Sequence, residues 1–209
     1  MSRICSLHTE QISSRRAVSS RIRGRCSLST LVESLKLIAV ACQSTEPSSI
    51  MVDKIIRFVD VLASRCVEKP IVLLGGYWGC MKYVADRAIE RGLTVVMFPP
   101  IEAENIAFPE KAIVLKTGLS YRLRSVAMVR SSDALVVLGG AAGTLQEAVT
   151  AYCEAKPLYV LSGTGLATDR LAVFAPYIDD RKIVEVKLFE EPEELADALC
   201  RDLGLHLGA

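Results

Sequence analysis

Short apolar segments alternate with longer amphipathic segments along the chain from Leu35 onward. Apolar, partly β-branched runs of a few residues are typical of buried strands, whereas apolar residues at helical spacing are typical of helices that pack on one face. This alternation predicts an α/β fold, a Rossmann-like doubly wound parallel sheet of about seven strands. The expected strands are 36–42, 71–74, 94–98, 112–116, 134–138, 158–161 and 183–186. The expected helices are 50–65, 79–91, 119–131, 144–155 and 192–203.

The first part of the chain lacks this pattern. Residues 1–32 are rich in Ser and Arg and have no apolar periodicity, so we predict a disordered tail followed by one Rossmann-like domain at 33–209, with no internal repeat. An organelle transit segment or a misassigned start codon would have the same composition. The longest apolar runs are far short of the ~20 residues that cross a bilayer, so no membrane association is expected.

Charge and cysteine content narrow the possible partners and compartment. The net charge is +1, but residues 1–30 hold six Arg against one Glu, which leaves about −4 on the rest of the chain. A mildly acidic body argues against nucleic acid as the main partner. The seven cysteines are scattered and contain no CxxC pair, so we interpret them as reduced, mostly buried thiols of a cytoplasmic protein.

Histidine is almost absent from the predicted domain. The only two histidines are His8 and His206, near the two ends of the chain. Catalysis by a nucleophile with a histidine base therefore lacks its key residue. Histidine-rich zinc sites lack it as well. Arg, Glu, Asp, Lys and backbone amides remain as candidates, and we expect neither a metal nor a cofactor.

A glycine-rich loop follows the predicted strand 134–138 and opens the next helix. Small residues expose successive backbone N–H groups, and the helix N-terminus adds partial positive charge, so the loop suits a phosphate group. No lysine follows Gly143, which excludes the P-loop pattern. We predict that this loop binds a phosphorylated, nucleotide-like molecule through Gly139, Gly140, Ala141, Ala142, Gly143 and Thr144.

A second glycine-rich loop follows the strand 71–74. Gly75, Gly76 and Gly79 would let the backbone approach a ligand closely, and we include them in the candidate nucleotide-binding set. A tight turn between strand and helix explains the same residues equally well. The dinucleotide-binding fingerprint is absent, because it would follow the first strand. A third cluster, 163–165, is interpreted as a turn.

Two charged residues near the 139–144 loop can be explained without a role in ligand binding or catalysis. Glu147 stands three positions after Thr144, the spacing of a capping box in which Thr144 would be the N-cap. Arg124 could be a solvated arginine on a helix surface.

A family resemblance changes this interpretation. The segment 119–161 resembles the LOG (Lonely Guy) family and its prokaryotic relatives, whose hallmark is PGGxGTxxE. Gly140, Gly143, Thr144 and Glu147 match that motif, and Arg124 stands at the family's distance ahead of the strand that precedes the loop. The loop at 75–79 is similar to the family's other glycine-rich loop. The resemblance extends over about 35–205, and it implies that Arg124 and Glu147 are catalytic.

Three positions depart from the family pattern. Gly139 replaces the family's Pro, Ala141 replaces a Gly, and Ser125 follows the arginine where Lys or Asn is usual. These departures resemble a divergent prokaryotic subgroup related to molybdenum cofactor carrier proteins.

The resemblance implies a nucleoside 5′-monophosphate phosphoribohydrolase that releases the free base and ribose 5-phosphate. The alternative is a carrier that binds a nucleotide or molybdenum cofactor without cleaving it. The family also implies a homodimer. Lysine decarboxylation, a label often given to such proteins, is rejected because no lysine stands in a context that suggests a Schiff base.

Overall fold

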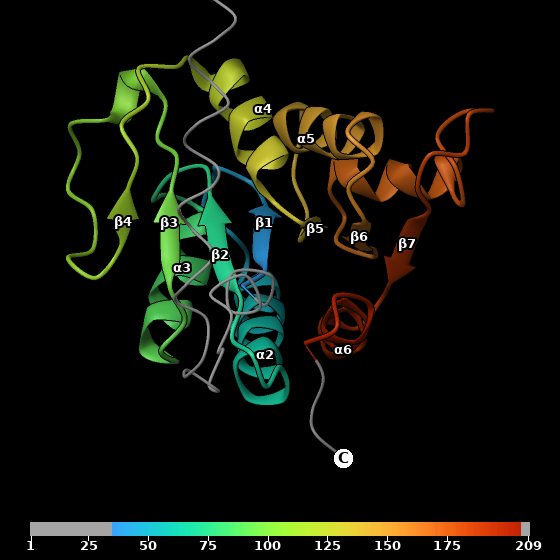
Figure 1. Ribbon diagram of the computed structural model, residues 1–209, viewed down its shortest axis with the longest axis horizontal. Coiled ribbons are helices and arrows are strands. Elements are labelled where there is room, and N and C mark those ends of the chain that lie inside the picture. The colour runs from blue at the N-terminus through green and yellow to red at the C-terminus, as the bar shows by residue number, and fades with distance from the viewer. Residues whose placement is uncertain (1–34, 206–209) are drawn as a thin grey trace, which may run out of the picture. The chain divides into compact units, whose positions relative to one another are not determined.

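The core of the protein is a seven-stranded parallel sheet. The computed structural model describes residues 35–205, so the predicted tail 1–32 lies outside the described part. The strand order is β4-β3-β2-β1-β5-β6-β7, and every neighbouring pair is parallel (Figure 1). This confirms the predicted Rossmann-like α/β class. The strands are β1 (Leu37–Ala41), β2 (Ile71–Leu74), β3 (Val95–Met97), β4 (Ile113–Val114), β5 (Ala134–Val137), β6 (Leu158–Leu161) and β7 (Val186–Phe189).

The direction of winding reverses between the central strands β1 and β5. From β1 the chain proceeds outward to β4, and then returns to pair β5 with the other side of β1. Ala41 at the end of β1 lies in register with Val137 at the end of β5. The connections that leave two such strands diverge to opposite faces, which opens a crevice beyond their carboxyl ends.

Helices cover both faces of the sheet. In Figure 1, α2, α3 and α6 lie on one side of the sheet, and α4 and α5 lie on the other. Two 3₁₀ segments, η1 (Ile101–Ala103) and η2 (Ala167–Phe174), complete the described elements. The helices are α2 (Ser49–Arg65), α3 (Cys80–Glu90), α4 (Tyr121–Ser131), α5 (Ala142–Cys153) and α6 (Pro192–Asp202).

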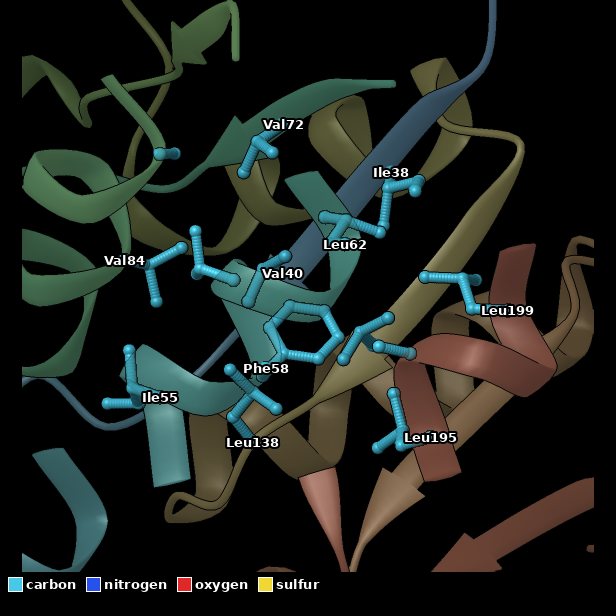
Figure 2. Close-up of a cluster of buried hydrophobic side chains, with 14 of the residues drawn as sticks. Ile38, Val40, Ile55, Phe58, Leu62, Val72, Val84, Leu138, Leu195 and Leu199 are labelled. Carbon is cyan, nitrogen blue, oxygen red and sulfur yellow. The ribbon is translucent and has the colours of Figure 1, made fainter. Parts of the chain in front are cut away.

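The central strands are buried on both faces, as expected for a parallel sheet between two helical layers. Alternate residues of β1 point to opposite sides, so Ile38 and Val40 pack against α2, whereas Ala39 and Ala41 join the core under α4 and α5. Figure 2 shows the first of these cores, where Phe58 of α2 lies among side chains from the sheet and from α6.

The seventh strand lies further along the chain than predicted. β7 is Val186–Phe189, not 183–186, and its register pairs Val186 with Leu158. The Ile183 amide donates to the Tyr152 hydroxyl at 3.3 Å, so the backbone there serves a contact with α5 rather than the sheet. Hydrophobic periodicity alone could not show which part of this segment joins the sheet and which part contacts α5.

The interpretation of all cysteines as reduced thiols is wrong for one pair. Cys66, the C-cap of α2, forms a disulfide with Cys200 of α6, and their Cα atoms are 5.6 Å apart. The two residues are separated by 134 positions, so no local spacing indicates the pairing. Packing of α2 against α6 brings them together. Cys42 and Cys80 are buried free thiols, and Cys153 is an exposed one.

No helix within residues 35–205 is both long enough and apolar enough to cross a membrane.

Candidate functional site

A cavity of about 420 Å³ opens at the reversal between β1 and β5. Its wall comprises the end of β1, the loop after β2 and the N-terminal turns of α4 and α5. Its size falls in the range of small-molecule sites. Eight of the predicted site residues line it, namely Gly75, Arg124, Gly140, Ala141, Ala142, Gly143, Thr144 and Glu147. Three others, Gly76, Gly79 and Gly139, do not.

The N-terminus of α5 presents free amides to this cavity. The N-cap is Ala141, and no side chain caps the helix. The N–H groups of Ala142, Gly143 and Thr144 therefore have no acceptor within the helix. The Gly140 amide is different, because it donates to Thr168 Oγ1 at 3.0 Å. An anion would thus be held by the first turn of α5 rather than by the glycine that precedes it.

Arg124 and Glu147 meet on the cavity wall. Arg124 Nη1 lies 3.3 Å from Glu147 Oε1, and both side chains are more than nine-tenths buried. They come from neighbouring helices, α4 and α5. The structure thus brings together, beside the glycine-rich loop, the two residues for which the family resemblance implies a catalytic role.

The capping-box alternative for Glu147 is wrong. Helix α5 begins at Ala142, two residues before the predicted start, so Thr144 belongs to its first turn and is not the N-cap. Glu147 then lies in the second turn, too far along the helix to bond back to the cap. Its carboxylate instead contacts Arg124 and Ser125 of α4.

Ser125 is a functional candidate that the sequence interpretation recorded only as a departure from the family. Its hydroxyl lies 2.7 Å from Glu147 Oε1 and 3.1 Å from the Tyr121 carbonyl oxygen. A hydroxyl has one proton to donate, and the shorter separation favours the carboxylate. Glu147 is therefore held by two donors from α4.

Burial dominates the electrostatics of the pair. It raises the pKa of Glu147, and the opposing effects of Arg124 and the Ser125 hydrogen bond reduce that rise. Burial also lowers the pKa of Arg124, whose guanidinium nevertheless stays protonated. Arg124 Nε is buried and has no hydrogen-bond partner in the described structure. An unpartnered buried donor is costly, so an oxygen acceptor on a ligand in this cavity would relieve it.

The glycines of the 75–79 loop mainly make room for other side chains. A Cβ on Gly75 would lie 1.7 Å from Arg124 Nη1, and one on Gly76 would lie 2.2 Å from Cη2 of Trp78. Gly79 has a φ of 53°, and a Cβ there would meet the Ser44 backbone. The tight-turn explanation therefore accounts for Gly79, whereas Gly75 is required for the position of the arginine.

Several lining residues gave no clear signal in the sequence. They include Arg122, whose Nη1 lies 3.0 Å from the point that a Cβ on Gly143 would occupy, and whose Nη1 is also 3.5 Å from Gln146 Oε1. The spacing of two residues between Arg122 and Arg124 gave no hint, because positions i and i+2 do not share a helix face. The remaining missed residues include Gln43, Ser44, Thr45, Trp78, Tyr121 and Leu166.

Comparison with known proteins places this geometry in a family. Residues 42–195 match the model of the SLOG cluster4 family. The crystal structure of TM1055, a structural genomics target, is 31% identical, with a TM-score of 0.71 over 80% of this chain and 99% of that one. No protein with a curated function matched the sequence.

Two more distant structures share the fold. The molybdenum cofactor binding protein from the phototrophic bacterium Rippkaea orientalis is 20% identical, with a TM-score of 0.64 over 81% of this chain and 97% of that one. The molybdenum cofactor carrier protein from Chlamydomonas reinhardtii is also 20% identical, with a TM-score of 0.63 over 81% and 98%. The family match spans most of the described residues and confirms the LOG-like resemblance, so the chain belongs to the SLOG cluster4 family.

Proposed function

We propose that this protein is a nucleoside 5′-monophosphate phosphoribohydrolase, which cleaves the N-glycosidic bond to give the free base and ribose 5-phosphate. One observation carries the proposal. The buried Glu147 carboxylate, held by Arg124 and Ser125, lies on the wall of the same cavity that the uncapped N-terminus of α5 lines. An anion site beside a buried carboxylate suits a phosphorylated sugar whose ring carbon becomes positively charged.

The proposed reaction needs no group beyond this chain and water. The 5′-phosphate binds the amides of Ala142, Gly143 and Thr144, with the Arg122 guanidinium beside them. As the bond between C1′ and the base nitrogen breaks, positive charge develops on the ribose, and the Glu147 carboxylate stabilises it. A water oxygen then bonds to C1′, and a proton of that water ends on the base nitrogen.

Arg124 has two functions in this mechanism. Its charge favours the ionised form of Glu147, against the effect of burial. Its unpartnered Nε can donate to a ligand oxygen. Both functions depend on the buried position of the guanidinium, where a charge-assisted hydrogen bond is stronger than in water.

The alternative is a carrier that binds a phosphorylated ligand without cleaving it. The free amides of α5 and Arg124 Nε would hold the phosphate of a nucleotide or of a molybdenum cofactor equally well. Ala141, which replaces a family glycine, and the shared fold of two proteins described as binding or carrying that cofactor support this alternative.

One assay distinguishes enzyme from carrier. The purified protein is incubated with a panel of purine and pyrimidine nucleoside 5′-monophosphates, and free base and ribose 5-phosphate are quantified by chromatography. We expect equal amounts of the two products from at least one nucleotide. Tight binding of the same nucleotides by calorimetry with no base released would reject the hydrolase and support the carrier.

Ser125→Ala is expected to shift the pH dependence of base release. Glu147 acts ionised, so activity falls as the pH drops through its pKa, which burial has already raised. The Ser125 hydrogen bond opposes that rise, and its removal raises the pKa further. The acid limb of kcat/KM should therefore move to higher pH. Ser125→Thr, which keeps the hydroxyl, is the control, and an unmoved limb in Ser125→Ala would contradict the assignment.

A homodimer remains a proposal. Leu123 of α4 and Val149 of α5 are apolar side chains exposed beside the site, with 58% and 45% of their surface accessible. Burying them against a second copy would remove apolar surface from water. Sedimentation equilibrium at micromolar concentration tests the dimer, and a monomer would reject it.

A further inference from the structure

The cavity has an aromatic wall that the proposed reaction does not yet use. Trp78, in the loop before α3, and Tyr121, the first residue of α4, both line it. Their ring centroids are 6.5 Å apart, with an interplanar angle of 71°. This edge-to-face geometry is a favourable one for aromatic pairs. Two segments far apart in the sequence thus bring their rings together at the site.

The aromatic wall and the anion-binding end belong to one cavity. Arg122 follows Tyr121 directly on α4, and its guanidinium reaches the first turn of α5 near Gly143. The wall of the cavity of about 420 Å³ therefore carries cations, free amides and two aromatic rings. Such a distribution fits a ligand that carries a phosphate and a planar group on one small framework.

The backbone at Gly76 leaves room for the indole ring of Trp78. A Cβ on Gly76 would lie between 2.2 and 2.7 Å from three atoms of the Trp78 six-membered ring. The absence of a side chain at position 76 thus lets this ring lie against the loop. Tyr121 is 42% exposed, so part of its ring remains accessible to a ligand.

We propose that Trp78 and Tyr121 form a stacking subsite for the planar heterocycle of a phosphate ester, with the ester's phosphate on the first turn of α5. The subsite selects ligands with an aromatic base over ribose 5-phosphate. Since every base has a π face, stacking recognises the class of ligand rather than a particular base. The proposal rests on the phosphate site of the proposed function, but it does not depend on cleavage.

The chain offers a direct probe, because Trp78 is its only tryptophan. The full protein is titrated with ribose 5-phosphate and with the carbocyclic analogue of AMP, which has no ring oxygen and cannot form an oxocarbenium ion. We expect the analogue to change the intrinsic fluorescence and to bind about 5- to 100-fold more tightly than ribose 5-phosphate. Ribose 5-phosphate should displace the analogue and restore the fluorescence.

Two variants separate stacking from a structural effect. Trp78→Leu should reduce the affinity for the analogue, measured by calorimetry, to about that of ribose 5-phosphate, and should leave the affinity for ribose 5-phosphate unchanged. Trp78→Phe, which keeps an aromatic face, should retain most of the preference. The subsite would be overturned if Trp78→Leu lost affinity for both ligands equally. It would also be overturned if the unmodified protein bound both ligands with equal affinity.

The outcomes for the subsite and for the hydrolase are distinguishable. Fluorescence change and preference for the analogue without base release from any nucleotide would reject the hydrolase and keep the subsite. Base release with equal affinities for the two ligands would reject the subsite and keep the hydrolase.

Discussion

Glu147→Gln is expected to slow base release by about 10²- to 10³-fold. The amide keeps the size of the side chain and an oxygen that can accept from Ser125, but it removes the negative charge that opposes the developing positive charge on the ribose. The loss should appear mainly in kcat, because this charge matters most in the transition state. The measurement is the rate of base release at saturating nucleotide, with affinity for the carbocyclic analogue measured in parallel.

A matched control lies at the C-terminal end of the same helix. Glu154, the C-cap of α5, pairs with Arg130 at 3.4 Å near the surface, away from the cavity. Glu154→Gln removes one carboxylate charge as Glu147→Gln does, and should leave turnover unchanged, since exposed ion pairs contribute little. Thermal unfolding of both variants identifies any loss of fold. An unaltered turnover in a folded Glu147→Gln protein would remove Glu147 from the mechanism.

Gly75→Ala should lower kcat/KM by about 10- to 100-fold, although the substituted residue carries no charge. The new Cβ would lie 1.7 Å from Arg124 Nη1, so the guanidinium must leave its place beside Glu147. Gly75 has no left-handed backbone conformation, so the cost is steric only. The melting temperature should also fall, because the displaced arginine leaves a buried carboxylate without its partner.

The neighbouring glycine supplies the control for this variant. Gly76→Ala adds the same methyl group one residue later, where it meets the Trp78 ring instead of the guanidinium. We expect this variant to bind the carbocyclic analogue more weakly and to keep its affinity for ribose 5-phosphate. If Gly75→Ala and Gly76→Ala had the same effects on both ligands, the loop would act only through its general conformation.

The fold was predictable because its signal is local. The central strands are short apolar runs buried on both faces, and helices such as α2 and α6 are long enough to show an apolar stripe, so most of the order of elements follows from the pattern. The Gly139–Thr144 loop was also visible, since small residues between a strand and a helix are recognisable without knowing their neighbours. A functional role for Arg124 and Glu147 was expected only through the family resemblance.

What the sequence determined by itself is therefore the βα alternation, the glycine-rich loop and the residue types at the site. Tertiary structure alone decided which groups meet: Ser125 with Glu147, Thr168 with the Gly140 amide, Gly75 with Arg124, and Cys66 with Cys200. Each pair joins segments that the chain separates by many residues. Such contacts leave no periodic trace in the sequence, because they arise only when helices and strands pack together.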